Sequence, residues 1–372
     1  MTTYLRTPEA ARRLGVTAAT LYSYVSRGRI DRTLGADGRS SLFDLADIDA
    51  LIATSSRPVP PPPTIDVRIS TSITQLDESG LRYRGTLVDE LVDQPFERVC
   101  GLLWHGSLDD SLDTPVLHAA GSPISSTSPA GLDVRSIIRL AADIGSDLEP
   151  IDAATELLGA ISVTRSGGSL ESAFADRVVR HWTDDPSPQL VRAVNATLVL
   201  LADHGLATST LAVRVATSVR ASPIASLIAG LATVEGELHG AASSHAQRLF
   251  EEVEADGASA VLTRYRRDKR RVPGFGHKIY RDRDPRFELL LDRVRALPDP
   301  CRRITVVDDT IDAACTQVSH PPNVDLALGA LAYIAGFPAD LPLFAVARIA
   351  GWTAHHLEEL DERPVRFRGL AN

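Results

Sequence analysis

Three histidines beside glycines, together with a few isolated charged residues, are the parts of this sequence that could carry out chemistry. "ADHG" contains His204, "LHG" contains His239 and "GFGHK" contains His277. The charged members of the set are Arg286, Asp325, Arg348 and Arg363. Arginine binds a carboxylate through paired hydrogen bonds, and a neutral imidazole can donate to a carbonyl or a developing enolate. An aspartate can remove a weakly acidic proton while that enolate is stabilised. Together these groups could form a carbon–carbon bond on a dicarboxylate.

Each of these residues also has an ordinary structural explanation when it is taken alone. His204 follows an apolar helical stretch, and a histidine at a helix end is more often structural than catalytic. The small residues around His239 could simply pack two helices together. Asp325 could cap a helix, and Arg348, among apolar residues, could form a structural ion pair. The chemistry is therefore indicated by the combination and not by any single member.

Composition excludes several other classes of protein. The chain has 372 residues, 44% of them hydrophobic, and a net charge of −9. It is long enough for two or three domains, and too acidic for a general polyanion binder. Cys100, Cys301 and Cys315 form no CxxC pair, which indicates a reducing compartment without disulfides or a cysteine metal site. No signal peptide or membrane-length apolar run is present, so we expect a cytoplasmic protein without a membrane partner.

A proline-rich stretch, "SSRPVPPPPT" at 55–64, marks the clearest boundary. Prolines cannot continue a helix, and such a run behaves as a semi-rigid spacer. We therefore predict an N-terminal domain at 1–54, a linker at 55–66 and a main body at 67–372.

The N-terminal domain has the pattern of a winged helix-turn-helix. We expect Thr7 and Thr17 to cap two short helices around the turn "GVT", followed by a Gly-rich hairpin and a third helix. Only Glu9 offsets five arginines in the first 30 residues: Arg6, Arg12, Arg13, Arg27 and Arg29. A recognition helix would present Ala18, Ala19, Thr20, Ser23 and Arg27 to a major groove. DNA binding and a role in self-association or docking both remain open.

The main body is predicted to be mainly α-helical. After a short hairpin in "TSITQLDESGLRYRG", stretches such as "FERVCGLLWHG" and "LVRAVNATLVLLADHG" place apolar residues at helical spacing. Strand-like runs are scarce, and "CRRITVV" fits a helix or a strand.

The segment "PGFGHKIYRDRDPR" resembles the signature of the citrate synthase family. It has a glycine-flanked histidine, a basic residue four positions later and then Asp-Pro-Arg. "ADHGLATST", "LHGAAS", "PNVD" and "RPVRFRG" follow the order of the family's motifs. The first 54 residues resemble MerR and excisionase helix-turn-helix modules. The resemblance implies a large helical domain at 67–240 and 337–372, and a small domain at 241–336 that closes on the substrate.

The resemblance also implies a role for each residue. His239 would hydrogen-bond the thioester oxygen of acetyl-CoA, Asp325 would take the methyl proton, and His277 would polarise the ketone of oxaloacetate. The carboxylates would be held by His204, Arg286, Arg348 and Arg363. Arg363 would reach the neighbouring subunit's site, which implies a homodimer. CoA phosphates would meet Arg271 and Arg281, and neither a metal nor a permanently bound cofactor is implied.

The implied reaction is that of citrate synthase, an acyltransferase of the tricarboxylic acid cycle. Acetyl-CoA and oxaloacetate would condense, and hydrolysis of the thioester would release citrate and CoA. Two alternatives stay open. One is 2-methylcitrate synthase acting on propionyl-CoA, since one methylene changes binding by only about 1–3 kcal/mol. The other is a DNA-binding regulator whose synthase-like body senses a metabolite.

Overall fold

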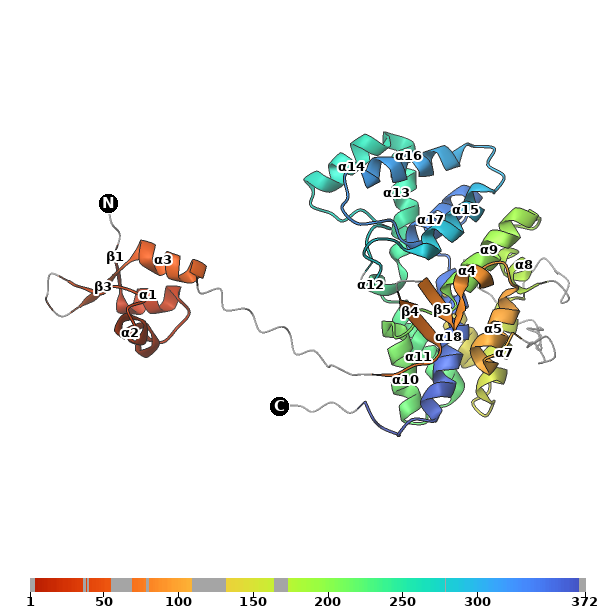
Figure 1. The fold of residues 1–372 in the computed structure, drawn as a ribbon, viewed down its shortest axis with the longest axis horizontal. Helices are drawn as coiled ribbons and strands as arrows, with labels where there is room; N and C mark the ends of the chain where they lie inside the picture. The colour runs from red at the N-terminus through yellow and green to blue at the C-terminus, as the bar shows by residue number, and fades with distance from the viewer. Residues whose placement is uncertain are drawn as a thin grey trace. The chain divides into compact units, whose positions relative to one another are not determined.

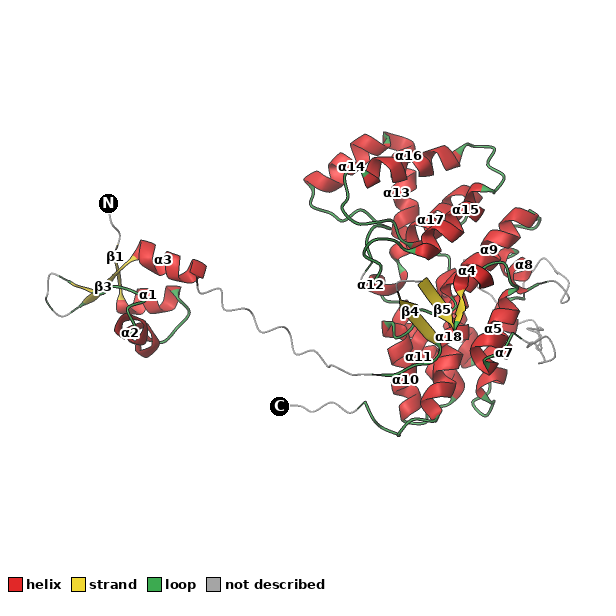
Figure 2. Ribbon diagram, viewed as in Figure 1, coloured by secondary structure: helices red, strands yellow, loops and turns green. Residues whose placement is uncertain are grey.

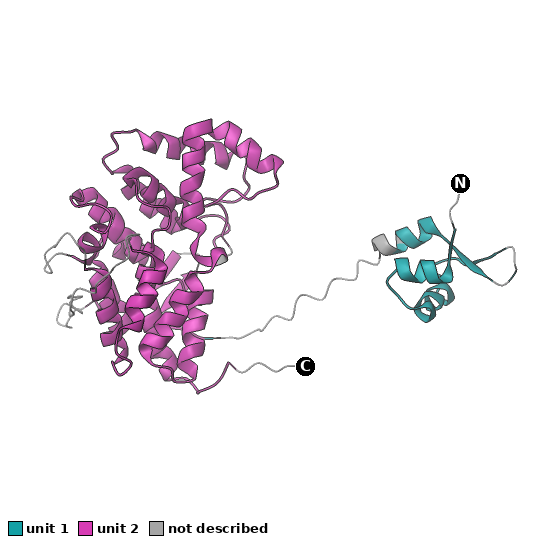
Figure 3. Cartoon of the chain, turned by 180° about the vertical axis from the view of Figure 1, so that it is seen from behind, with its two compact units in different colours: residues 1–69 teal, residues 70–372 magenta. Residues whose placement is uncertain are grey.

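The computed structural model describes residues 4–35, 38, 40–54, 69–77, 80–108, 132–163, 173–277 and 279–367. The chain forms two compact units, Met1–Ile69 and Ser70–Asn372, which Figure 3 shows in different colours. The predicted proline-rich linker lies outside the described residues. Its boundaries at 54 and 67 therefore stay a prediction.

The first unit combines three helices with a small antiparallel sheet. The helices are α1 (Thr7–Arg13), α2 (Ala18–Ser26) and α3 (Leu45–Thr54). The strands are β1 (Tyr4–Arg6), β2 (Thr33–Leu34) and β3 (Ser41–Asp44), in the order β1-β3-β2. The core of this unit contains Ala10, Leu21, Ile30, Phe43 and Ile48. These elements confirm the predicted helix-turn-helix and its hairpin.

Two helix starts in this unit show how local chemistry sets the fold. The Thr17 hydroxyl accepts a hydrogen bond from the backbone of Thr20 at 3.3 Å, as expected for a helix cap. The expectation for Thr7 was wrong, because Arg6 occupies the cap and α1 begins at Thr7. The Glu9 carboxylate accepts from the Arg6 backbone at 3.0 Å, so this cap is satisfied from within the helix.

The second unit is almost entirely helical (Figure 2). Its short antiparallel sheet has the order β4-β5-β6 (Thr74–Asp77, Gly80–Tyr83 and Thr86–Leu87). Its helices are α4 (Val88–Leu91), α5 (Phe96–His105), α6 (Val134–Ala142), α7 (Pro150–Ile161), α8 (Phe174–Val179), α9 (Pro188–Leu201), α10 (Thr208–Ser218), α11 (Pro223–Val234), α12 (Glu237–Gly240), α13 (Ala242–Asp256), α14 (Ala258–Arg267), α15 (Pro285–Arg295), α16 (Arg303–Cys315), α17 (Val324–Ala335) and α18 (Leu343–Leu360). The ambiguous run "CRRITVV" is therefore helical from Arg303 onward, where α16 begins.

Two groups of helices make up this second unit. Figure 1 shows α13 to α17 gathered together, with the other helices and the sheet in a second group around α18. α18 packs against α5, α7, α9, α10 and α11, and its apolar sequence is buried on nearly every side. α17 packs against α13 and α15, while α15 also contacts α9. The predicted small domain, 241–336, covers the first group, although its exact boundaries stay a prediction.

No helix in the described part of the chain is long and apolar enough to cross a membrane. All three cysteines are free: Cys100 is buried, while Cys301 and Cys315 are exposed.

Candidate active site

The glycine loop that carries His277 is fastened to the start of α17, the helix that carries Asp325. Gly274 and Gly276 have φ angles of +76° and +85°, which favour glycine. The Asn323 side chain donates to the Gly276 carbonyl at 2.7 Å, and the Asn323 backbone donates to the Gly274 carbonyl at 2.9 Å. This attachment sets His277 beside the first turn of α17, where Asp325 lies.

His277 is held with one ring nitrogen facing its own loop. Its Nδ1 accepts hydrogen bonds from the backbone N–H groups of Ile279 and Tyr280, at 3.1 and 3.2 Å. Burial, with the nearby charge of Arg286, lowers the pKa of His277. The neutral ring therefore carries its proton on Nε2, which is the nitrogen available as a donor to a ligand.

His204 lies next to His277 at the end of α9. The two rings meet edge to face with their centres 5.2 Å apart, and His204 Nε2 is 3.3 Å from the hydroxyl of Tyr280. Burial, followed by the charges of Arg286 and Arg348, holds the pKa of His204 well below its usual value. Both imidazoles thus favour the uncharged form at neutral pH, and both lie near the charge of Arg286.

Arg286 is the first of these cations. Its side chain is buried, and its Nε and Nη2 donate to the two carboxylate oxygens of Asp284 at 3.0 and 2.8 Å. Burial alone would lower the pKa of Arg286, but Asp284 raises it above its usual value. Asp284 also accepts from the backbone of Val324 at 3.1 Å, so the same carboxylate connects α15 to α17.

Arg348 is the second cation and projects from α18. It is 1% exposed, and its Nε donates to the carbonyl of Leu201 at 2.9 Å. Its Nη1 is buried and has no hydrogen-bond partner among the described residues. An unpaired buried cationic donor is costly, and a bound anion would satisfy it. Arg348 is therefore the best-placed side chain to hold a ligand carboxylate.

Asp325 occupies the first turn of α17, where the Asn323 side chain accepts from its backbone at 3.0 Å. Burial raises the pKa of the Asp325 carboxyl; Arg286 and Arg348 oppose this effect, and Asp284 adds to it. No hydrogen bond to this carboxyl is formed by residues within the described ranges. A carboxylate with a raised pKa and free oxygens suits a general base.

His239 lies on the other side of Arg348, at the end of α12. Its Nε2 is 2.9 Å from the Ser209 hydroxyl, and its ring meets Phe344 edge to face at 5.7 Å. The centre of the Phe344 ring also lies 4.5 Å from the guanidinium carbon of Arg348. The same aromatic ring therefore contacts both His239 and Arg348. Burial, followed by Arg348, lowers the pKa of His239.

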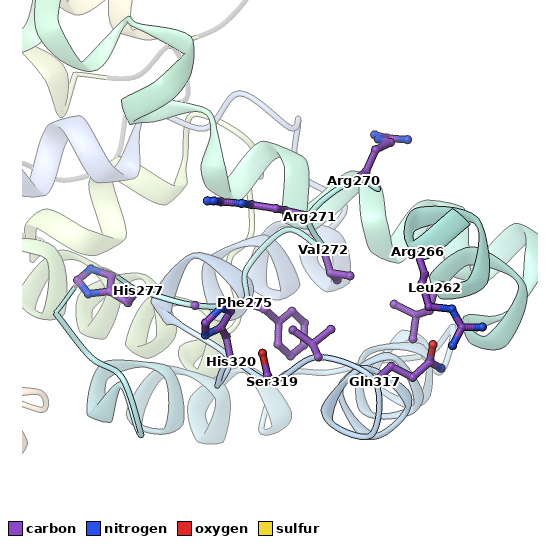
Figure 4. A pocket seen from close by; sticks show the side chains of 12 residues that line it. Leu262, Arg266, Arg270, Arg271, Val272, Phe275, His277, Gln317, Ser319 and His320 are labelled. Carbon is purple, nitrogen blue, oxygen red and sulfur yellow. The ribbon is translucent and has the colours of Figure 1, made fainter. Parts of the chain in front are cut away.

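The three remaining predicted residues are placed differently. Arg271 lines a pocket of about 590 Å³ that reaches His277. Figure 4 shows His277 at one end of this pocket, Phe275 and His320 beside it, and Arg266 at the other end. Other basic and polar residues of the lining are Arg270, Gln317 and Ser319. The side chains of Arg281 and Arg363 are exposed, so their predicted roles stay predictions.

Several residues that shape the site were not singled out in the sequence. Tyr280 and Asp284 lie within the motif that carries His277, and Asp203 directly precedes His204. Their position beside a predicted site residue is the only signal that could have found them. The cap of α17 was considered only at Asp325, whereas the structure has it at Asn323. Asn323 also fastens the glycine loop, through a contact 47 positions away in sequence.

Asp203 fastens the His204 loop to the rest of the unit. It is fully buried, and its Oδ2 accepts from the backbone of Gly205 at 2.9 Å and from Thr74 of β4. His355 of α18 is 3.3 Å from the same oxygen. Burial alone would raise the pKa of Asp203, but His355 and Arg348 lower it. The negative charge is therefore favoured in the folded protein.

We expect Asp203→Asn to lower the free energy of unfolding by about 3 kcal/mol at pH 7, as for loss of a buried charge partner. The lowered pKa makes this stabilisation present above pH ~4 and lost as the pH falls through the folded-state value. The difference between wild type and variant should therefore shrink as the pH falls below about 4. Urea unfolding followed by tryptophan fluorescence measures it, since all three tryptophans lie in the second unit. A difference independent of pH would contradict this account.

Comparison with known families decides what this site belongs to. The family described as the C-terminal domain of citrate synthase matches residues 151–368, which is more than half of the chain. The chain belongs to the citrate synthase family. That match includes every predicted site residue from His204 to Arg363. A helix-turn-helix domain family matches residues 4–56 and confirms the predicted N-terminal module.

Curated relatives within the citrate synthase family cover most of the chain. A citrate synthase from Haloferax volcanii is 28% identical over 340 residues, which are 78% of this chain and 89% of the relative. 2-Methylcitrate synthase 2 from Corynebacterium glutamicum is 26% identical over 336 residues, 77% of this chain and 86% of the relative. The sequence is thus similar to synthases of both names.

Solved structures confirm the expected citrate synthase fold. Citrate synthase from Thermotoga maritima has a TM-score of 0.70 at 23% identity and covers 82% of this chain and 92% of its own. Citrate synthase from Pyrobaculum aerophilum has a TM-score of 0.69 at 21% identity, covering 92% and 94%. Among the residues that the structure describes, no cluster of histidine, cysteine and acidic side chains could hold a metal ion.

Proposed function

We propose that this protein is a citrate synthase, condensing acetyl-CoA with oxaloacetate and hydrolysing the resulting thioester to citrate and CoA. The observation that carries the proposal is the contact of two neutral imidazoles, His204 and His277, near two buried cations, Arg286 and Arg348. Two guanidinium groups suit the two carboxylates of a ketodiacid. The neutral rings suit a polar but uncharged ketone between them.

The first step of the proposed reaction is removal of a methyl proton from acetyl-CoA. Asp325 takes this proton, because its carboxyl is free of hydrogen bonds and its pKa is raised by burial. The thioester oxygen gains negative charge as the proton leaves. His239 stabilises that oxygen with a hydrogen bond from its ring, whose orientation is set by Ser209.

The second step joins the methyl carbon to the ketone carbon of oxaloacetate. His277 Nε2–H donates to the ketone oxygen, which becomes an alkoxide as the new bond forms and then receives that proton. His204, Arg286 and Arg348 hold the carboxylates, so the ketone stays in reach of the nucleophile. Water then attacks the thioester, and CoA leaves.

The pocket beside His277 is the proposed CoA site. It extends from His277 to Arg266 at its other end, and its lining also includes Arg270 and Arg271, whose charges suit phosphate groups. Arg281, exposed nearby in sequence, is a second proposed phosphate ligand. CoA would thus be a co-substrate and not a resident cofactor.

A homodimer completes the proposal. Arg363 is exposed and follows α18, so it is free to reach a second subunit's carboxylate site.

The small domain, 241–336, would close over the substrates and exclude water while the enolate exists. Exposed free thiols at Cys301 and Cys315 suit the reducing cytoplasm.

The proposal is tested by CoA release from the purified full chain with acetyl-CoA or propionyl-CoA and oxaloacetate. We expect turnover that depends on oxaloacetate and a higher kcat/KM for acetyl-CoA. A preference for propionyl-CoA would instead identify a 2-methylcitrate synthase, the activity named for the Corynebacterium relative. Absence of turnover with both thioesters, while a control synthase works, would overturn the proposal.

A second function is favoured by the helix-turn-helix match at residues 4–56. Arg27, at the end of α2, is exposed together with Arg12 and Arg29, and these charges could meet DNA phosphates. Arg13 differs from them, because Asp49 pairs with its guanidinium at 2.7 Å. We propose that the first unit binds duplex DNA and makes the protein a metabolite-responsive regulator as well as an enzyme.

We expect Arg27→Gln to weaken DNA binding about tenfold at 0.1 M salt, while Arg13→Gln, the matched control, changes it by less than about threefold. Fluorescence anisotropy with duplexes selected from a random pool measures both affinities, with and without oxaloacetate. The logarithm of the affinity should fall steeply with the logarithm of the salt concentration. Equal effects of the two substitutions, or a selection that enriches no sequence, would contradict the proposal.

A further inference from the structure

Tyr280 lies among three of the groups proposed to bind the ketodiacid, yet the reaction described above does not use it. Its backbone N–H donates to Nδ1 of His277 at 3.2 Å. Its hydroxyl is 3.3 Å from Nε2 of His204. Its ring lies 5.0 Å from the guanidinium carbon of Arg286. The side chain is 8% exposed, so these contacts form in a largely buried environment.

The hydroxyl of Tyr280 is in hydrogen-bond contact with the ring of His204. Burial raises the pKa of Tyr280 to about 12, so the hydroxyl keeps its proton at neutral pH. The His204 ring is neutral, since burial holds its pKa well below the usual value. Nε2 can therefore accept from the Tyr280 hydroxyl, with the ring proton on Nδ1, and this contact holds the orientation of the ring.

The aromatic face of Tyr280 acts on Arg286. A guanidinium attracted to the face of a ring is oriented by it, and the attraction grows when water is excluded. Asp284 already engages Nε and Nη2 of Arg286. The ring of Tyr280 and the carboxylate of Asp284 together leave the guanidinium little freedom, although neither needs to touch the ligand.

We propose that Tyr280 is a positioning residue for the ketodiacid. Its hydroxyl fixes His204 and its ring fixes Arg286, so both ligand-binding side chains are arranged before the ligand enters. Preorganisation of this kind increases affinity, because less freedom is lost on binding. This inference rests on the proposed function, since it assigns His204 and Arg286 to the carboxylates of the same substrate.

Two substitutions separate the hydroxyl from the ring. Tyr280→Phe removes one buried hydrogen bond and keeps the ring, and we expect KM for oxaloacetate to rise about tenfold. We expect kcat to stay within about threefold, because no reacting atom is touched. Tyr280→Leu removes both contacts and should raise KM about 10²-fold. Steady-state CoA release at saturating acetyl-CoA measures all three enzymes.

Tyr333→Phe is the matched control. Tyr333 is 3% exposed and lies 5.0 Å from the guanidinium carbon of Arg303, in the last turn of α17 and outside the site. Its substitution should leave KM for oxaloacetate unchanged. The inference is overturned if Tyr280→Phe keeps the wild-type KM or shifts it no more than Tyr333→Phe does. It is also overturned if kcat, KM and the melting temperature of Tyr280→Phe all deteriorate together, as for a purely structural residue.

The same variants distinguish this inference from the proposed function. If the wild type releases no CoA, the proposed function fails, and calorimetry with oxaloacetate then replaces KM by Kd. A Kd about tenfold weaker in Tyr280→Phe than in wild type would still support the positioning role. An equal Kd in the two proteins, or no oxaloacetate binding by the wild type, would overturn it.

Discussion

Asp325→Asn should lower kcat for CoA release by about 10²–10⁴-fold, as expected when a general base is removed. The carboxyl lies in the first turn of α17, near Arg286 and Arg348, with a pKa raised by burial. An asparagine of nearly the same shape can fill the site but cannot accept the methyl proton. KM for oxaloacetate should change little, since the carboxylate ligands are untouched. Steady-state kinetics of the purified variant measures the effect.

Stability provides the control for this variant. A raised carboxyl pKa means that folding disfavours the charged form, and this cost is present at pH values above the unfolded-state pKa. Asp325→Asn should therefore keep or increase the melting temperature at pH 7. Asp340→Asn, at an exposed position, should alter neither property. Wild-type kcat in Asp325→Asn, or a loss of kcat explained by unfolding, would contradict the assignment of Asp325 as the base.

Arg348→Gln should raise KM for oxaloacetate about 10²-fold. The buried Nη1 of Arg348 lacks a partner within the described residues and is proposed to bind a carboxylate. A charge-assisted hydrogen bond contributes about 1.5–3 kcal/mol, and a factor of ten in affinity corresponds to about 1.4 kcal/mol. Glutamine still offers an N–H group toward the Leu201 carbonyl, so the fold should survive. Kinetics with varied oxaloacetate measures the change.

Arg293→Gln is the comparison for Arg348→Gln. Arg293 pairs with Asp93 at 2.7 Å, and that carboxylate is mostly exposed, so its loss should leave KM within about twofold. The melting temperature of Arg348→Gln should stay equal to or above that of wild type, because an incompletely paired buried cation is removed. An unchanged KM for oxaloacetate in Arg348→Gln would show that this arginine does not hold the substrate.

The types of the site residues could be predicted from sequence, because each stands out against its surroundings. Arg348 lies in an apolar helix and Asp325 follows two prolines and an asparagine. The glycines around His277 mark a loop with positive φ angles, which the structure has at Gly274 and Gly276. Such local signals report on backbone conformation and on unusual burial of charge. They can therefore be recognised in the sequence without knowing which residues the side chains contact in the folded protein.

The contacts that arrange the site could not be predicted in the same way. Asp203 meets Thr74 and His355, which are 129 and 152 positions away, and only the folded chain brings them together. In the sequence, Tyr280 resembles any aromatic residue near a turn. Its proposed role depends on simultaneous contacts with His204, His277 and Arg286, which only the folded chain shows. The cap at Arg6 was missed because the Thr7 hydroxyl contacts Tyr22, 15 positions away, while Glu9 accepts from the Arg6 backbone.

Product analysis with isotope-labelled acetyl-CoA tests the central claim most directly. The full chain is incubated with oxaloacetate and acetyl-CoA labelled in both acetyl carbons, and the products are identified by mass spectrometry. The account predicts citrate carrying both labelled carbons, formed in equal amount with free CoA, and formed at least about 10²-fold more slowly by Asp325→Asn. Free CoA accompanied by labelled acetate in place of labelled citrate, or no product at all, would contradict it.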